Sequence, residues 1–112
     1  MLDKIVEKTK ERVSETKKVN SLDRLKYKIL NIEVKFNYPF KKALSSDDIE
    51  IIEEVKKASP SKGLIAENFD YVSIAKEYEV AGASAISVLT EPYFFQGSDD
   101  YLKEIAKNVK IP

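Results

Sequence analysis

The first part of the chain carries apolar side chains at the spacing of amphipathic helices. A stripe at i, i+3, i+4, i+7 and i+11 predicts a helix over residues 2–18, and its members are Leu2, Ile5, Val6, Thr9 and Val13. Ser21 is a suitable N-cap for a second helix that ends near Leu30. A proline then interrupts the pattern, and one short helical turn is expected over residues 40–44. We therefore predict an N-terminal helical segment, residues 1–46.

The rest of the chain alternates short apolar runs with helical stripes. Residues 49–52 predict a buried strand and residues 84–89 a second strand. Helices are predicted to begin at Asp70 and at Ser98, which are both good N-cap residues. Strands that alternate with helices are typical of a parallel sheet with right-handed crossovers. The pattern thus predicts an α/β fold for residues 47–112.

Composition excludes several classes of function. Basic and acidic side chains number 19 each, which argues against a nucleic-acid-binding or polybasic membrane protein. Residues 1–42 hold 12 basic and 6 acidic side chains, an excess that we interpret as solvated helix faces. The absence of cysteine and histidine excludes disulfides, thiolate chemistry, Ser–His triads and the usual metal ligands. No apolar run approaches the roughly 18–20 residues of a membrane span, and no signal-peptide core is present, so we expect a cytoplasmic protein.

The best candidate for chemistry lies at the end of the first predicted strand. Glu54 and Lys56 are two residues apart, so their side chains point to the same face, roughly 6–7 Å apart along the strand. Ile52 shares this face, while Val55 takes the other. An inward-facing charged pair is costly unless it lines a pocket. The predicted loop after it, residues 57–69, is long for a connection between a strand and a helix, and long loops in compact domains are often functional.

Two blocks of sequence resemble a known family. The first reads Glu54-x-Lys56-x-x-Ser59-Pro60-Ser61-x-Gly63. The second consists of Gly82-Ala83, then Ile86-Ser87-Val88-Leu89-Thr90-Glu91, then Phe95 and Gly97-Ser98. In order and spacing, these blocks are similar to the first and second barrel strands, with their following loops, of the indole-3-glycerol phosphate synthase family.

The resemblance implies a fold. It implies the N-terminal part of a (β/α)8 TIM barrel, with residues 47–112 as its first two βα units and residues 1–46 as an N-terminal helical extension. A complete barrel needs about 250 residues, and this chain has 112. The family's general-acid lysine, on the third strand, and other parts of its site would lie beyond Pro112. We therefore expect a fragment that is inactive by itself.

The resemblance also implies a reaction. The family converts 1-(2-carboxyphenylamino)-1-deoxyribulose 5-phosphate to indole-3-glycerol phosphate by ring closure, decarboxylation and dehydration. This carbon–carbon lyase step belongs to tryptophan biosynthesis and needs neither a metal nor an organic cofactor. The expected partner is thus a small phosphorylated substrate, and not a nucleic acid or a membrane. Fusion to, or association with, other tryptophan-pathway enzymes is compatible with the resemblance.

Five residues match functional positions of the family. Glu54 matches a glutamate that acts in proton transfer and orientation, and Lys56 matches a lysine that contacts the substrate and its phosphate. Both are predicted to be catalytic, and Lys56 also to bind substrate. Ser59 and Pro60 match residues that line the mouth of the site. Phe95 matches an aromatic residue that packs on the anthranilate ring.

Each of these assignments has a structural alternative. The Glu54–Lys56 pair is also the pattern of an ion pair at a strand end, Ser59-Pro60 that of an ordinary turn, and Phe95 that of a core aromatic under a loop. For the whole chain, the alternative is a non-catalytic half-barrel-like module, or a decayed gene product, that associates with another chain. A further alternative is another phosphate-handling barrel of the pathway, such as phosphoribosylanthranilate isomerase. It is not favoured, because those enzymes lack the first block.

Overall fold

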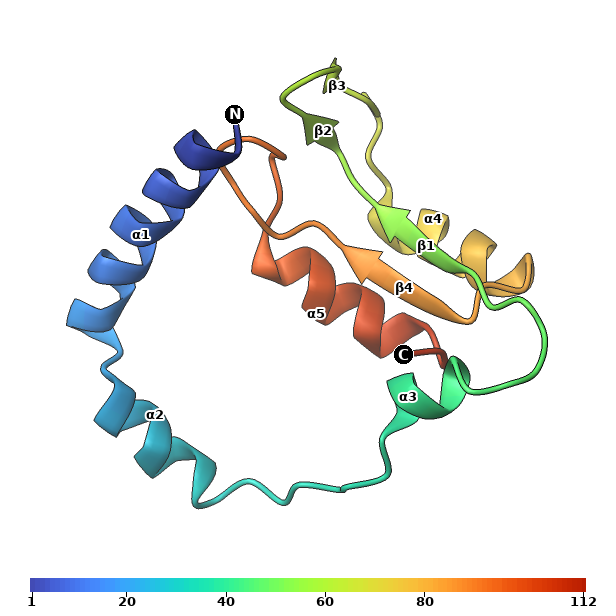
Figure 1. The fold of residues 1–112 in the computed structure, drawn as a ribbon, viewed down its shortest axis with the longest axis horizontal. Helices are drawn as coiled ribbons and strands as arrows, with labels where there is room; N and C mark the ends of the chain where they lie inside the picture. Colours follow the sequence, from blue (N-terminus) through green and yellow to red (C-terminus); the bar gives the residue numbers. More distant parts are fainter. The chain divides into compact units, whose positions relative to one another are not determined.

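Five helices and four short strands follow one another along the chain (Figure 1). In order they are α1 (Leu2–Val19), α2 (Leu22–Ile29), α3 (Pro39–Ala43), β1 (Ile52–Val55), β2 (Ala58–Ser59), β3 (Gly63–Leu64), α4 (Tyr71–Val80), β4 (Ala85–Val88) and α5 (Asp99–Asn108). The structure, a computed structural model, describes residues 1–112. It divides into two compact units, Met1–Asn37 and Tyr38–Pro112. Helix α3 belongs to the second unit, whereas the boundary predicted from the sequence follows residue 46.

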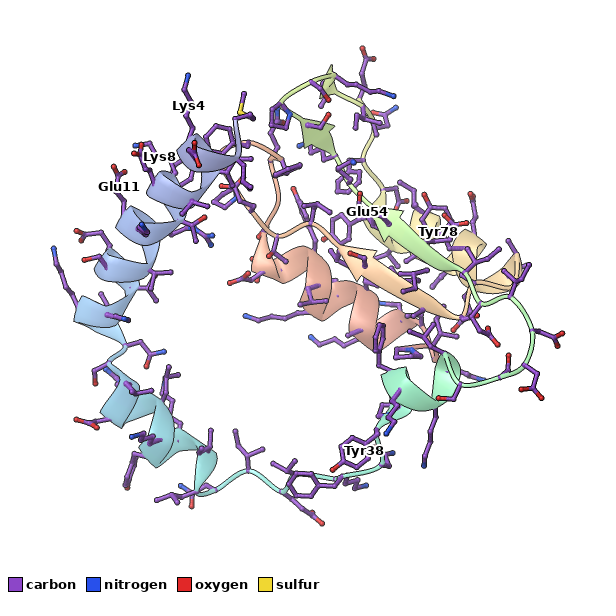
Figure 2. The ribbon with its side chains drawn as sticks, viewed as in Figure 1. Lys4, Lys8, Glu11, Tyr38, Glu54 and Tyr78 are labelled. Carbon is purple, nitrogen blue, oxygen red and sulfur yellow. The ribbon has the colours of Figure 1, made fainter.

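The first unit contains the two predicted N-terminal helices. The hydroxyl of Ser21 accepts the backbone N–H of Arg24 at 3.2 Å, which confirms the predicted cap of α2. Lys8 and Glu11 form an ion pair at 2.8 Å on the surface of α1 (Figure 2). No residue of α1 or α2 is buried within the structure. None of the helices of the chain combines the length and apolar composition needed to cross a membrane.

The second unit is built on a parallel pair of strands, as predicted. β1 pairs with β4 so that Ile52 lies beside Ala85, Glu54 beside Ser87, and Val55 beside Val88. Helix α4 provides the crossover between the two strands, and both strands run toward the same edge of the sheet (Figure 1). The order of elements confirms the predicted α/β fold.

One face of this sheet packs against α4 and α5. The core consists of Val55 from β1, Ala75 from α4 and Ile105 from α5, which are all fully buried. Partly buried apolar side chains surround it: Phe69, Tyr71, Ile74, Tyr78, Ile86, Val88 and Val109. Because strand side chains alternate, Glu54 lies on the opposite face from Val55, which confirms the predicted alternation.

The predicted first strand is present, but its predicted start at residue 49 and the predicted burial of residues 49–52 are wrong. The strand begins at Ile52, and the side chains of Ile49, Ile51 and Ile52 are 92, 53 and 48% exposed. Ile49 and Ile51 precede the strand, and Ile52 lies on the face that α4 and α5 do not cover. An apolar run indicates that burial of the segment would be favourable in free energy. Whether the segment is buried depends on which helices or strands from elsewhere in the chain pack over it.

Helices α4 and α5 begin where the sequence predicts. The side chains of Asp70 and Ser98 accept hydrogen bonds from N–H groups in the first turns of α4 and α5. Gly82 ends α4 at a φ of +99°, a conformation that favours glycine. The N–H groups of Gly82 and Ala83 bind carbonyls of the last turn, at 3.1 and 3.0 Å, in the manner of a Schellman cap.

A carboxylate on α4 holds the segment that follows α5. Oε2 of Glu79 accepts the backbone N–H of Lys110 at 2.6 Å and that of Ile111 at 3.0 Å. The carbonyl of Pro112 accepts the N–H of Ile86 at 2.9 Å, so this segment runs beside β4. The hydrogen bonds from Ile111 and Lys110 lower the pKa of Glu79 from its ordinary value of 4.5.

Candidate active site

The end of β1 brings Glu54, within the strand, and Lys56, directly after it, into contact. Oε1 of Glu54 and Nζ of Lys56 are 3.0 Å apart, and the two side chains are 45% and 32% exposed. Figure 2 shows Glu54 on β1. The hydroxyl of Tyr78 donates to the main-chain carbonyl of Glu54 at 3.4 Å, and neither charged side chain belongs to the core that packs under α4 and α5. The prediction that the two side chains share a face is confirmed.

The environment of this pair permits chemistry. A partly exposed ion pair stabilises a fold by only about 0–1 kcal/mol, because water screens it. Both groups stay accessible to a ligand on the face opposite α4 and α5. The ion pair that was the structural alternative for these residues is thus present, and it is compatible with a role in binding or proton transfer.

The predicted loop after β1 contains a small hairpin that the sequence reasoning missed. β2 and β3 pair antiparallel, with Ala58 beside Leu64 and Ser59 beside Gly63. The carbonyl of Lys57 closes the base of the hairpin by accepting the N–H of Ile65 at 2.8 Å. The strands have two residues each, too few to show an alternation of apolar and polar positions. The available signal was Gly63, whose φ of +63° favours glycine and permits the tight turn.

Ser59 and Pro60 lie in this hairpin. Ser59 is only 8% exposed, and its Oγ accepts the backbone N–H of Lys62 at 3.2 Å. Its hydroxyl also lies 3.5 Å from that of Ser61. Pro60 is exposed in the turn. The structure therefore gives Ser59 a part in the turn, and its predicted contact with substrate stays a prediction.

Phe95 lies in the loop between β4 and α5, where its side chain is partly buried. Its backbone N–H donates to Oε2 of Glu91 at 3.2 Å, and the N–H of Phe94 donates to the same oxygen at 2.6 Å. Oε1 of Glu91 accepts the N–H of Tyr93 at 3.0 Å. Glu91 belongs to the second sequence block, but the sequence reasoning assigned it no role. No local pattern marked it, because the side chains that commonly bind nearby backbone N–H groups are the shorter ones of Ser, Thr, Asn and Asp.

Gly97 closes the same loop. Its N–H donates to the carbonyl of Glu91 at 2.8 Å. A Cβ atom at this position would lie 2.3 Å from the carbonyl oxygen of Leu89 and 2.6 Å from the carbonyl carbon of Thr90. No residue with a side chain fits without a shift of the backbone, so the loop is pressed against the end of its own strand.

The two loops leave the sheet at the same edge, the carboxyl ends of β1 and β4 (Figure 1). Functional residues are frequent at this edge of parallel sheets. The hydrogen bonds of Ser59 and Phe95 stay within their own loops and do not reach the Glu54–Lys56 pair. A groove of this unit lies elsewhere, on the helix side of β4, and is lined by Ile86, Val88, Leu102, Ile105, Ala106, Val109, Lys110, Ile111 and Pro112. A cleft shared by Glu54 and Lys56 is still only predicted.

Comparison with known proteins identifies the family. A family model described as indole-3-glycerol phosphate synthase matches residues 2–112. Proteins of that name from Ruminiclostridium cellulolyticum and Endomicrobium trichonymphae are 54% and 56% identical to the chain over 112 residues, and one from Sulfurimonas denitrificans is 46% identical over 119. Each match covers the whole of this chain and 43% of the relative, so the chain spans about two fifths of the length of these curated relatives. The chain belongs to the indole-3-glycerol phosphate synthase family.

Proposed function

We propose that residues 1–112 are the N-terminal part of an indole-3-glycerol phosphate synthase. This lyase closes the indole ring of 1-(2-carboxyphenylamino)-1-deoxyribulose 5-phosphate with loss of carbon dioxide and water. The observation that carries the proposal is the Glu54–Lys56 pair, 3.0 Å apart at the carboxyl end of a parallel strand and open to solvent. Family membership over residues 2–112 supports it.

The same proposal gives the fold its place in a larger one. β1 and β4 are the first two strands of a (β/α)8 barrel, and residues 47–112 are its first two βα units. Residues 1–46 are a helical extension that precedes the barrel. The face that carries Ile52, Glu54 and Ser87 is the inner face of the barrel, and the hydrogen bond from the N–H of Ile86 to the carbonyl of Pro112 supports a third strand beside β4.

Glu54 and Lys56 have complementary roles in this reaction. The ammonium of Lys56 attracts the anionic groups of the substrate, its carboxylate and its phosphate. The carboxylate of Glu54 takes and returns protons during ring closure and dehydration. An anion that binds Lys56 competes with Glu54 for the same ammonium, so substrate binding loosens the ion pair and leaves the carboxylate available to the reacting atoms.

The two loops supply the remaining contacts. Phe95 offers an aromatic surface for the anthranilate ring, since aromatic rings stack favourably on one another. Ser59 and Pro60 form the rim beside β1. The hydroxyl of Ser59 accepts a hydrogen bond from Lys62, and its proton can turn from the neighbouring hydroxyl of Ser61 to an anionic substrate group. No metal or organic cofactor takes part in this proposal, the cytoplasm is the expected compartment, and association with other enzymes of the pathway stays a prediction.

A hybrid protein tests the proposal. We define the joined enzyme as residues 1–112 of this chain followed by the remaining sequence of the Ruminiclostridium cellulolyticum relative, which is 54% identical over the replaced part. We expect it to form indole-3-glycerol phosphate, which is measured by the fluorescence of this product. The relative itself is the positive control. A joined enzyme that melts cooperatively but forms no product would favour the non-catalytic module instead.

The joined enzyme also tests the contact between α4 and the segment after α5. The pKa of Glu79 is lowered in the folded state from its ordinary value of 4.5. The charged carboxylate therefore stabilises the fold fully at pH values above 4.5, and this stabilisation is lost as the pH falls through the lowered pKa. Glu79→Gln should therefore lower the melting temperature at neutral pH, and the difference should shrink as the pH falls below 4.5. Glu77→Gln, an exposed residue of the same helix, is the control. Equal melting curves for the Glu79 variant and the parent at neutral pH would contradict this role.

A further inference from the structure

The loop between β4 and α5 is organised by a single carboxylate. Three consecutive backbone N–H groups, those of Tyr93, Phe94 and Phe95, converge on Glu91 at 2.6 to 3.2 Å. Hydrogen bonds to an ionised acceptor are stronger than neutral ones. Residues 91–97 contain no helix or strand, so these N–H groups have no partner from regular secondary structure. The side chain of Glu91 supplies the hydrogen-bond acceptor that a helix or a neighbouring strand would otherwise provide.

The far end of the loop is fixed as well. The N–H of Gly97 binds the carbonyl of Glu91 at 2.8 Å, which closes residues 91–97 into a ring. Gly97 is pressed against the backbone of Leu89, and Ser98 then caps α5 through the N–H of Asp100. The backbone of Phe95 is thus held from both sides, by Glu91 within the ring and by the start of α5 after it.

Glu91 differs from Glu54 in what its oxygens can still do. One oxygen of Glu91 accepts one N–H group and the other accepts two. The carboxylate of Glu54 instead pairs with the flexible ammonium of Lys56. Both oxygens of Glu91 are therefore engaged by its own loop, and its effect on a reaction is exerted through the residues that it holds.

We propose that Glu91 is a positioning residue for the synthase reaction, which sets the place of the Phe95 side chain by holding the backbone of residues 93–95. This inference rests on the proposed function. Phe95 can stack on an aromatic ring only if its own ring stands at a fixed distance and tilt. A displacement of about 1 Å in a positioning group can cost as much as about 100-fold in rate.

Kinetics of the joined enzyme test the proposal. Glu91→Ala should lower kcat/KM by on the order of 10-fold to 100-fold, and Glu91→Asp should restore part of it, because aspartate also binds the backbone N–H two residues ahead. In a Phe95→Ala background, Glu91→Ala should cost little more, since residues that act through one another are not additive. Glu77→Ala removes an exposed charge from α4 and serves as the control. Two results would overturn the proposal. One is a normal kcat/KM in Glu91→Ala, and the other is that Glu91→Ala lowers kcat/KM as much in the Phe95→Ala background as in the parent.

Limited proteolysis gives a readout that does not depend on activity. Chymotrypsin cleaves after aromatic residues, and the loop contains Tyr93, Phe94 and Phe95. Cleavage in this loop should be slow in the joined enzyme and much faster in Glu91→Ala, with cleavage elsewhere and the melting temperature little changed. Equal cleavage rates would overturn the role of Glu91 in holding the loop. If the joined enzyme itself is inactive, the proposed function is overturned, and the catalytic role of Glu91 is overturned with it. The proteolysis result then still tells whether Glu91 holds the loop.

Discussion

Glu54→Gln or Lys56→Met in the joined enzyme should lower kcat/KM by on the order of 10²-fold or more, the usual range for an acid–base or charge-stabilising group. The glutamine substitution keeps the shape of the side chain but removes its charge and its proton affinity, and the methionine substitution removes the cation. Both side chains are partly exposed and lie on the face opposite the core. The variants should therefore remain largely folded, and the lower kcat/KM should come from the missing catalytic group.

Controls on α4 separate this effect from a general loss of surface charge. Glu77→Gln and Lys76→Met make the same two changes at exposed positions and should leave kcat/KM near that of the parent. Melting curves check that each variant is folded at the assay temperature. Near-normal turnover in either site variant, assayed by the fluorescence of indole-3-glycerol phosphate, would move that residue to a structural role as a strand-end ion pair.

Residues 1–112 expressed alone should show no ring-closure activity and should associate or form a molten state. The sheet has only two paired strands, β1 and β4, and open strand edges promote pairing between molecules. Apolar side chains at and before β1 are about half exposed or more, namely Ile49, Ile51 and Ile52. Ordering the backbone costs about 1–2 kcal/mol per residue, and a core of so few buried side chains offsets little of it.

Sedimentation velocity and dye binding measure this outcome. We expect oligomers or aggregates, together with binding of a dye that reports exposed apolar surface and a broad, non-cooperative melt. The joined enzyme, purified in the same way, is the control and should melt cooperatively. A monodisperse monomer of residues 1–112 with a sharp melt would contradict the prediction and favour the independent module.

Local features of the fold were predictable because their physical causes are local. The caps at Ser21, Asp70 and Ser98 bind N–H groups two or three residues away, and the stop at Gly82 requires only a positive φ. The alternation of Glu54 and Val55 follows from the geometry of any strand. The two sequence blocks, around Glu54 and Lys56 and around Ile86 to Ser98, also indicated the family without a structure, because the residues of each block are close together in the chain.

Other features depended on contacts that no local pattern specifies. The sequence predicted burial for residues 49–52, yet Ile52 is exposed, because burial is decided by which face the helices cover. It predicted a loop where β2 and β3 form a hairpin, since strands of two residues leave no periodicity to detect.

For the site, the sequence by itself determined the chemical groups and the face from which they act. Only the tertiary structure decided that the carboxylate of Glu54 meets the ammonium of Lys56 directly, and that both oxygens of Glu91 bind the backbone of its own loop. The physical reason is that residue type and spacing define which hydrogen bonds and ion pairs a side chain can make. The path of the folded backbone then selects one set from these by bringing particular donors and acceptors within about 3 Å of each other.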